Sequence, residues 1–359
     1  MKDFLIKGIK ARGVNAPLKY PVYTAMGAVE TSPLVLIDVL TTTDEVGHAY
    51  IFGYTPLTIK PLISIIMGME SALIGLPVAP QSIEKILSEK FTLLGFTGLV
   101  RMACSGIDMA LWDLLSKQAG LPLYKYLGGI AQPIKSYDSH SMDGRNLAAE
   151  RAAGAASSGF KGIKTKIGYS SVQEDINVIR GIRKEVGDNF SIMVDFNQSL
   201  TVPQAIARGQ ALQDEGIAWI EEPTLQYDYD GHKRIRESLN VPIQMGENWI
   251  GPEEMMNACM AGASDLAMPD IMKIGGVTGW LRASALAQQF SLPMSSHLFQ
   301  EFSAHLLTVT PTADWLEKLD IAESVVDSSL KFVDGNVIIS DEPGAGITWK
   351  ESEIVKYII

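Results

Sequence analysis

Two lysines separated by a single residue occupy the stretch Gly162-Ile163-Lys164-Thr165-Lys166-Ile167-Gly168. The apolar residues and glycines around them are typical of a short, largely buried strand. Alternate residues of a strand point to the same face, so the ammonium groups of Lys164 and Lys166 would lie side by side. Neighbouring cations repel each other and are costly to bury unless anions face them. The pattern therefore predicts either an edge strand with solvated lysines or a buried site where anions meet both.

Ionisable residues recur where the following apolar runs end. A βαβ unit takes about 30 residues, and the carboxyl ends of parallel barrel strands share one face, where barrel enzymes have their active sites. The spacing predicts such a barrel. An open doubly wound sheet is the rival, disfavoured because no glycine-rich phosphate turn follows the first of these strands. The series is Lys166, Asp195, Glu221, Glu247, Asp270 and His297, with separations of 29, 26, 26, 23 and 27 residues.

Three of these side chains are carboxylates on successive strand ends: Asp195, Glu221 and Glu247. Hard divalent cations take oxygen ligands, and Mg²⁺ usually keeps open positions for water or substrate. Without a cation, clustered carboxylates would repel one another and raise one another's pKa. Each acid alone would be interpreted as a helix cap or a solvated loop residue. Three in register predict a divalent metal site.

His297 and Asp270 close neighbouring strands of the predicted barrel. A carboxylate bonded to one ring nitrogen fixes the histidine tautomer and raises the basicity of the other nitrogen. The pair is therefore predicted to be a base and its orienting partner. A zinc-binding helix with His297, Glu301 and His305 on one face is a competing interpretation, and a purely structural histidine is another. Pro293, just before His297, favours a strand end over that helix.

Glu317 falls where an eighth strand would end. It could stay protonated and donate a hydrogen bond to a developing oxyanion, although alone it would be a solvated glutamate. Lys166 is expected to lose its proton near neutral pH, because Lys164 and the metal disfavour its charged form. A metal between a lysine and a histidine would bind a carboxylate substrate and stabilise an enolate-like dianion. Bases on opposite faces of one carbon would permit inversion.

Composition limits the classes of protein. The 359 residues are 47% hydrophobic and 20% charged, an ordinary globular composition with room for a barrel and a smaller domain. A net charge of −11 without a basic stripe argues against nucleic acid as a partner. Cys104 and Cys259 lack metal spacing and suit a reducing compartment. No apolar leader and no run of transmembrane length is evident, so we expect a cytoplasmic protein that does not bind membranes.

The chain divides into three parts. Residues 1–132 read as an α+β domain, in which the Pro-, Gly-, Tyr- and Val-rich segment at about 16–33 is predicted to be a long loop acting as a lid. Residues 133–320 alternate short apolar runs with helical segments, as βα units do. Residues 321–359 are expected to return to the first domain. The elements expected in that domain are strands in 3–13 and 34–53 and helices at about 56–75, 82–90 and 97–119.

Along essentially its whole length the chain resembles the mandelate racemase group of the enolase superfamily. The Lys-x-Lys motif together with the His–Asp pair is quite specific. The resemblance implies an α/β fold, namely a modified TIM barrel, (β/α)₇β, under an N-terminal α+β capping domain. It also implies Mg²⁺ on the three carboxylates and a homo-oligomer, an octamer. The stretches that carry it are 137–141, 164–169, 245–249, 273–280 and 295–301.

The resemblance further implies a role for each polar residue. Lys166 would be the base for the S enantiomer and His297 the base for the R enantiomer. Lys164 would neutralise the substrate carboxylate, Glu317 would hydrogen-bond it, and Asp270 would tune His297. Further polar positions of the site are matched by Ser139 and Asn197.

Apolar side chains are expected beside the metal and favour an aryl 2-hydroxy acid, because a sugar acid would leave hydroxyl groups unpaired. We therefore predict a Mg²⁺-dependent racemase of mandelate or a similar aryl 2-hydroxy acid, working by two-base 1,1-proton transfer. The alternatives are an acid-sugar dehydratase with the same lysine, histidine and metal, and a non-catalytic metal-binding homologue. The lid departs from the family pattern at Tyr23, Met26 and Glu30. The expected pocket residues are Val22, Val29, Tyr54, Leu93, Leu298 and Leu319.

Overall fold

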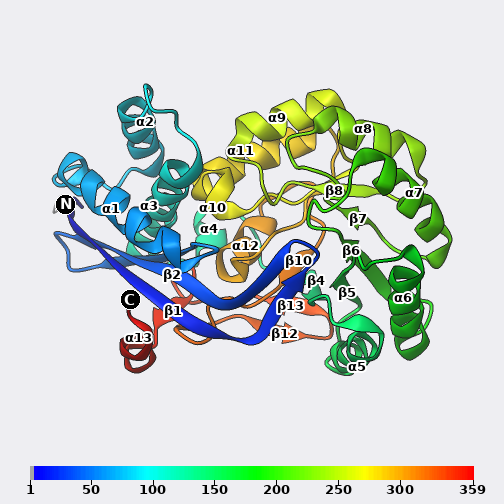
Figure 1. The fold of residues 1–359 in the computed structure, drawn as a ribbon. Coiled ribbons are helices and arrows are strands. Elements are labelled where there is room, and N and C mark those ends of the chain that lie inside the picture. Colours follow the sequence, from blue (N-terminus) through cyan, green and yellow to red (C-terminus); the bar gives the residue numbers. More distant parts are fainter. Residues whose placement is uncertain (1–3) are drawn as a thin grey trace.

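The computed structural model describes residues 4–359, which form a capping domain beside a barrel (Figure 1). In the capping domain, a three-stranded antiparallel sheet in the order β1–β2–β3 packs against helices. Helix α3 lies so close to β3 that a Cβ on Gly47 would be 2.1 Å from the carbonyl oxygen of Ala110. The elements are β1 (Ile6–Thr24), β2 (Gly27–Thr41), β3 (Val46–Phe52), η1 (Pro56–Thr58), α1 (Ile59–Leu73), α2 (Pro80–Lys90), α3 (Gly98–Gln118) and α4 (Leu123–Tyr126).

The lid is a β-hairpin, so the loop predicted at 16–33 is wrong. Strand β1 continues to Thr24 and β2 starts at Gly27, and the hairpin reaches over the barrel (Figure 1). The prolines that suggested a loop are tolerated because β1 is an edge strand of its sheet. The pairing register shifts between Pro17 and Val22, and such a bulge absorbs residues that cannot join the ladder.

Helix α1 corrects one expectation about apolar runs. Together with the preceding turn, Pro56–Leu73 is the single segment of the described chain long and apolar enough, by length and composition, to cross a membrane. Its residues Ile59, Leu62 and Ile66 are fully buried, and the helix packs on β1 and α3. Burial of positions three and four residues apart is typical of a helix covering a domain core.

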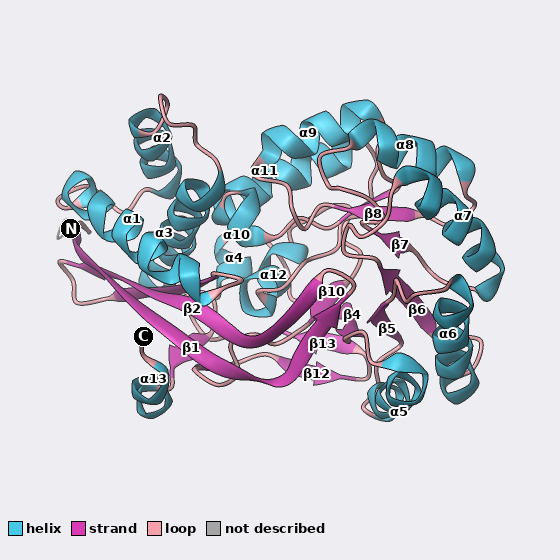
Figure 2. Ribbon diagram, viewed as in Figure 1, coloured by secondary structure: helices cyan, strands magenta, loops and turns pink. Residues whose placement is uncertain are grey.

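The predicted barrel is confirmed. Strands β4 to β9 pair in parallel in chain order, and β10 pairs in parallel with β4. The ring closes through Met294, which bridges Ala267 on β9 and Ala313 just before β10. Helices cover the outside of the strands (Figure 2). The strands are β4 (Ile134–Ser139), β5 (Gly162–Lys166), β6 (Ser191–Asp195), β7 (Ile220–Glu221), β8 (Ile243–Met245), β9 (Leu266–Ala267) and β10 (Leu316–Lys318).

The helices between these strands follow the chain around the barrel, and the turn α10 stands directly before α11. They are α5 (Gly144–Ser157), α6 (Val172–Val186), α7 (Val202–Leu212), η2 (Gln213–Glu215), α8 (Tyr229–Ser238), α9 (Pro252–Ala261), α10 (Ile271–Ile274), α11 (Gly276–Gln289) and α12 (Gln300–Leu307).

The C-terminal segment contacts both domains. Strand β13 pairs antiparallel with β4 of the barrel, whereas Ile358 bridges Val14 of β1, and Arg12 bonds Glu351 at 2.6 Å. The C-terminal end therefore lies beside β1 of the capping domain (Figure 1). The domain limits at 132 and 320 stay predictions. The elements of this segment are β11 (Val326–Ser328), β12 (Lys331–Val333), β13 (Asn336–Ile338), β14 (Ile347–Trp349) and α13 (Glu351–Tyr357).

A buried acid joins the two domains. Asp108 on α3 accepts hydrogen bonds from the backbone N–H of Thr278 on α11 at 2.9 Å and from its hydroxyl at 2.5 Å. The indole N–H of Trp112 donates to the same hydroxyl oxygen at 2.9 Å. Burial raises the pKa of Asp108 to about 7, although the bonds from Thr278 oppose the rise.

This shift predicts a pH-dependent stability. The folded pKa lies above the ordinary value, so the folded protein binds the proton more tightly and gains stability at low pH. We expect that gain to disappear as the pH rises from 4 to above 7, on the order of 4 kcal/mol if Asp108 acted alone. Asp108→Asn cannot ionise, so its unfolding free energy should change less between pH 5 and 8 in urea titrations. If the unfolding free energies of both proteins changed equally with pH, the raised pKa of Asp108 would be contradicted.

Candidate active site

The two lysines lie on an interior strand at the barrel mouth. Strand β5 pairs with β4 on one side and β6 on the other, and Lys164 and Lys166 are only 1% and 6% exposed. Anions meet both ammonium groups. Lys164 Nζ lies 2.6 Å from Glu221 Oε1 and 2.7 Å from Glu317 Oε1, and Lys166 Nζ lies 2.6 Å from Asp195 Oδ2. The alternative of an edge strand with solvated lysines is therefore wrong.

The three predicted metal ligands come together. Asp195 ends β6, Glu221 ends β7 and Glu247 follows β8, and one ligand oxygen from each lies within 4.8 Å of the others. Backbone and ring donors aim two of them: the N–H of Asn197 bonds Asp195 Oδ1 at 2.7 Å, and the indole of Trp219 bonds Glu221 Oε2 at 3.2 Å. Adjacent strand ends thus bring acids far apart in sequence into one cluster.

The charges around this cluster fit a divalent cation. Burial, with repulsion from Asp195 and Glu247, raises the pKa of Glu221 to about 8 despite the nearby Lys164. Carboxylates outnumber cationic groups by two when every group is charged, so a divalent cation would balance the site. The acids are Asp195, Glu221, Glu222, Glu247, Asp270 and Glu317, and the cationic groups are Lys164, Lys166, Lys273 and His297.

His297 and Asp270 form the predicted pair. His297 Nδ1 lies 2.8 Å from Asp270 Oδ2, and its Nε2 lies 3.2 Å from Glu247 Oε2. Burial alone would lower the pKa of His297, but the charge of Glu247 and the bond to Asp270 raise it to about 9. The zinc-helix interpretation is wrong. Glu301 accepts a bond from Tyr50 at 2.6 Å, and His305 Nδ1 faces the backbone N–H of Tyr124 at 3.2 Å.

The neighbours of Glu317 favour its ionised form over the protonated form predicted for it, whereas the deprotonation predicted for Lys166 depends on a bound metal and stays a prediction. Burial would raise the pKa of Glu317, but the ammonium of Lys164 and the N–H of Leu298, at 2.9 Å, lower it to about 2. Glu317 is therefore ionised rather than held protonated. Burial and Lys164 lower the pKa of Lys166, but the carboxylates of Asp195, Glu247 and Glu221 together raise it above its ordinary value. The protein's own carboxylates thus favour the ammonium form of Lys166.

Several buried polar atoms near the mouth have no hydrogen-bond partner. They include Ser139 Oγ at the end of β4 and Asn197 Oδ1 after β6, and Asn197 also adopts a left-handed backbone with φ of 46°. Buried polar atoms are normally paired, so unpaired ones need an explanation. A polar ligand at the mouth would satisfy both.

The predicted pocket residues are distributed unevenly. Leu298 is buried, Val22, Val29 and Leu319 are half-buried at the lid and rim, and Tyr54 is held at φ of 60° beside Lys273. Leu93 is not brought in: it is 103% exposed in the loop after α2, so its placement in the pocket of this chain is wrong. Sequence alone could not place that loop.

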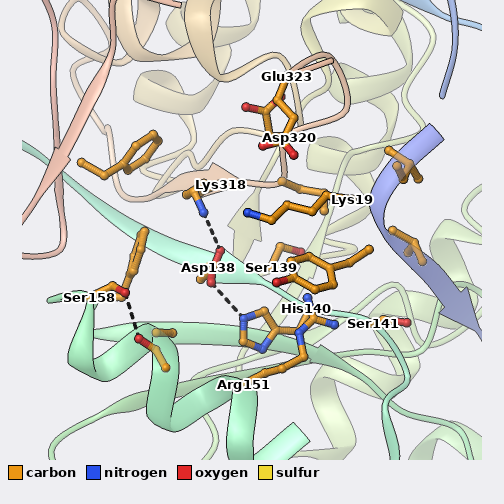
Figure 3. Close-up of a pocket in the computed structure, with 18 of the residues that line it drawn as sticks. Lys19, Asp138, Ser139, His140, Ser141, Arg151, Ser158, Lys318, Asp320 and Glu323 are labelled. Atoms are coloured by element: carbon orange, nitrogen blue, oxygen red, sulfur yellow. Dashed lines mark hydrogen bonds and ion pairs between the residues drawn. The ribbon is translucent and has the colours of Figure 1, made fainter. Parts of the chain in front are cut away.

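A cavity of about 510 Å³ lies beneath the lid, between β4, β10 and α5 (Figure 3). Among the residues that line the cavity, Asp138 bonds His140 at 3.0 Å and Lys318 at 3.2 Å. Ser139, the residue between Asp138 and His140, also lines the cavity. Lys164, Lys166 and the three clustered carboxylates do not line this cavity, whereas the predicted pocket residues Val22 and Leu319 do.

Sequence reasoning missed a polar group behind Glu247. Asn248 Nδ2 donates to Glu222 Oε2 at 2.7 Å and to Glu247 Oε1 at 3.1 Å, and Lys273 Nζ donates to Asn248 Oδ1 at 2.6 Å. One signal was available. Lys273 is the single charged residue between Asp270 and Arg282, in a stretch that is almost wholly buried.

This fold and site define a capped barrel with a carboxylate cluster between a lysine and a histidine. Residues 7–128 match the family described as "Mandelate racemase / muconate lactonizing enzyme, N-terminal domain", and residues 147–353 match "Enolase C-terminal domain-like". The chain belongs to the mandelate racemase/muconate lactonizing enzyme group of the enolase superfamily.

Relatives in this family carry several activities. An L-talarate/galactarate dehydratase of Salmonella typhimurium strain LT2 is 32% identical over 280 residues, covering 76% of this chain and 70% of the relative. A D-galactarolactone cycloisomerase of Agrobacterium fabrum is 28% identical over 98% of both chains. An L-Ala-D/L-Glu epimerase of Clostridium acetobutylicum is 26% identical over 96% of this chain and 98% of the relative. Family membership therefore does not select one reaction.

Solved structures support the metal prediction. An enolase from Bradyrhizobium, complexed with magnesium and mandelic acid, is 43% identical, with a TM-score of 0.96 over 100% of this chain and 99% of that chain. An enolase from alpha proteobacterium bal199 with bound magnesium is 36% identical, with a TM-score of 0.97 over 99% and 100%. The acidic cluster and these magnesium-bound relatives agree on Mg²⁺ as the family's cofactor.

Proposed function

We propose that the protein is a Mg²⁺-dependent racemase that interconverts the enantiomers of mandelate or a similar aryl 2-hydroxy acid. The observation that carries the proposal is the placement of two bases on one acidic cluster. Lys166 contacts Asp195, and His297 contacts Glu247, so each base lies next to a different carboxylate of the cluster. A substrate held at the cluster would meet a base on each side, as inversion at one carbon requires.

The chain's own residues would bind the substrate carboxylate. Mg²⁺ on Asp195, Glu221 and Glu247 would supply Lewis-acid stabilisation of developing negative charge. Lys164 already holds two carboxylates, Glu221 and Glu317, and could exchange one for the substrate. The freed Glu317 would lose the cation that keeps it ionised. It could then take a proton and hydrogen-bond the substrate.

Proton transfer would use Lys166 for the S enantiomer and His297 for the R enantiomer. The raised pKa of His297 makes it a proton donor at neutral pH, held in orientation by Asp270. Lys166 must be neutral to accept a proton. Its carboxylate partner is the predicted metal ligand Asp195, so charge neutralisation there would remove the interaction that raises the pKa of Lys166.

Apolar residues support an aryl substrate. Leu298 follows His297 and is buried, and Val29 is a half-buried residue of the lid; sugar hydroxyls placed against such aliphatic side chains would lack partners. The Bradyrhizobium structure holds mandelic acid. We further infer a homo-oligomer, an octamer by family resemblance, in the cytoplasm. A dehydratase acting on an acid sugar is the second candidate, because the talarate/galactarate dehydratase is among the relatives.

Isotope exchange separates these candidates. The protein would be incubated with Mg²⁺ and each mandelate enantiomer in D₂O, and optical rotation would be followed together with loss of the α-proton signal. We expect racemisation, with solvent deuterium in the product. Silence with mandelate but a 2-keto product from an acid sugar would replace the racemase with the dehydratase. Mg²⁺ binding without exchange on any hydroxy acid would indicate a non-catalytic homologue.

A further inference from the structure

A lysine without a carboxylate partner is buried behind the site. Lys273, on α10, is 7% exposed, and no carboxylate within residues 4–359 lies at ion-pair distance from it. Lysine is almost never fully buried unless it is paired, because desolvating an ammonium is costly. Two contacts compensate. Nζ donates to Asn248 Oδ1 at 2.6 Å and lies 4.5 Å from the centroid of the Tyr54 ring.

The first contact determines which way the Asn248 amide points. An ammonium can only donate, so the amide must present its oxygen to Lys273. Its NH₂ group then faces the two glutamates, Glu222 Oε2 at 2.7 Å and Glu247 Oε1 at 3.1 Å. Glu247 is one of the three clustered carboxylates. Lys273 thereby orients a cluster acid through one intervening side chain.

The second contact reaches the capping domain. Tyr54 follows β3 and holds a left-handed backbone with φ of 60°, which is uncommon for a bulky residue. Its ring packs against Phe52, with centroids 4.6 Å apart, and covers the ammonium of Lys273. A cation over the face of an aromatic ring is attracted to it, and Tyr54, itself 37% exposed, shields the ammonium of Lys273 on one side. Lys273 thus ties an aromatic residue of the capping domain to the barrel.

The same short turn also carries Asp270. Asp270 Oδ1 accepts the backbone N–H groups of Met272 at 2.8 Å and Lys273 at 3.1 Å, while its Oδ2 holds His297. The backbone of Lys273 is therefore anchored by the carboxylate that orients the histidine. Its side chain extends from a fixed base toward Asn248 and Tyr54.

We propose that Lys273 is a positioning residue that couples the capping domain to the metal centre, orienting Glu247 through Asn248 and holding Tyr54 over the substrate pocket. The role of Tyr54 in turnover rests on the proposed racemase function. The effect of Lys273 on metal affinity through Asn248 does not.

Metal affinity tests the first part without turnover. Free Mn²⁺ would be titrated by electron paramagnetic resonance into the full chain and into Lys273→Met. Removing the partner of a metal ligand typically weakens metal binding by about 10–100-fold, and we expect that loss here. Lys273→Arg keeps a cation that can donate to Asn248 and should recover most of the affinity. The matched control is Lys85→Met, because Lys85 is exposed on α2 and remote from the cluster.

A double-mutant cycle identifies the route. If Lys273 acts through Asn248, the double variant Lys273→Met/Asn248→Ala should bind Mn²⁺ no more weakly than Asn248→Ala alone. Additive losses, or unchanged affinity in Lys273→Met, would overturn the proposal. If Lys273→Met does not fold, as judged by circular dichroism, the Mn²⁺ affinities of Lys273→Arg and Asn248→Ala still test whether Lys273 acts through Asn248. Wild-type affinity in Asn248→Ala would then reject the relay.

Kinetics at saturating metal test the contact with Tyr54. We expect Lys273→Met to raise KM for mandelate about tenfold while kcat falls less than threefold, because the pocket wall is loosened and both bases remain. A fall in kcat with unchanged KM would overturn the role assigned to Tyr54. If the wild-type protein turned over no hydroxy acid, the proposed function would fail, and the Mn²⁺ titrations would still judge Lys273.

Discussion

Replacing His297 by asparagine is expected to abolish α-proton exchange on the R enantiomer while sparing exchange on the S enantiomer. Loss of a general base costs about 10²–10⁴-fold in rate. Asparagine can still donate one hydrogen bond to Asp270, now 2.8 Å from the ring nitrogen, so the Asp270 carboxylate stays paired. Lys166 pairs with Asp195 rather than with His297, so it should continue to exchange the S proton. The measurement is loss of the α-proton signal of each separate mandelate enantiomer in D₂O.

The reciprocal variant, in which the other base is replaced, completes this test. Lys166→Met should spare exchange on the R enantiomer and abolish it on the S enantiomer. Both variants should lose racemisation, because inversion needs both bases. Equal loss of exchange on both enantiomers in His297→Asn, with normal Mg²⁺ binding, would contradict the two-base assignment. It would instead indicate that His297 supports the site as a whole.

Removing the metal is expected to stop exchange on both enantiomers together. The cluster is the electrostatic centre of the site, and losing stabilisation of a developing oxyanion costs about 10²–10³-fold or more per interaction. Treatment with a chelator should therefore abolish turnover, and added Mg²⁺ should restore it. The protein should also become more stable when Mg²⁺ is added, by about 2.7 kcal/mol at a concentration of 100 Kd. Thermal unfolding with and without Mg²⁺ measures this gain.

The variant Glu221→Gln distinguishes the contribution of the metal from that of the two bases. It removes one negatively charged oxygen ligand and leaves Lys166 and His297 in place, so both the Mg²⁺-dependent stabilisation and the exchange should be lost. His297→Asn is the matched control, since it should lose one exchange reaction and keep the stabilisation by Mg²⁺. A Glu221→Gln protein that exchanged normally without Mg²⁺ would show that the cluster is not the catalytic centre.

Much of the barrel and its acidic cluster could be predicted from the chain because periodicity reports them directly. A βα unit has a nearly constant length, so Asp195, Glu221 and Glu247 had to end adjacent strands once the barrel was recognised. The alternation of side chains on β5 likewise placed Lys164 and Lys166 on one face. These are local geometric rules, and they hold without knowledge of any distant contact.

The lid was predicted less well, since its structure depends on which strand forms the edge of the sheet. Pro17 and Pro21 would interrupt a central strand, but β1 is the edge strand of its sheet and has a bulge between Pro17 and Val22. The prediction that Leu93 lines the pocket was wrong for a related reason. Its exposure depends on where the loop after α2 projects, and no periodic pattern encodes that direction.

By itself, the sequence determined the barrel, the strand ends and most of the ionisable residues at its mouth, but not Glu222 or Lys273. Only the tertiary structure decided their charge states and partners. The Asp195 carboxylate, at 2.6 Å, favours the ammonium form of Lys166, and the Lys164 ammonium, at 2.7 Å, favours the carboxylate form of Glu317. Lys273 acquired a place in the site only through folding. Electrostatic energy depends on distance and burial in three dimensions, and neither can be read from spacing along the chain.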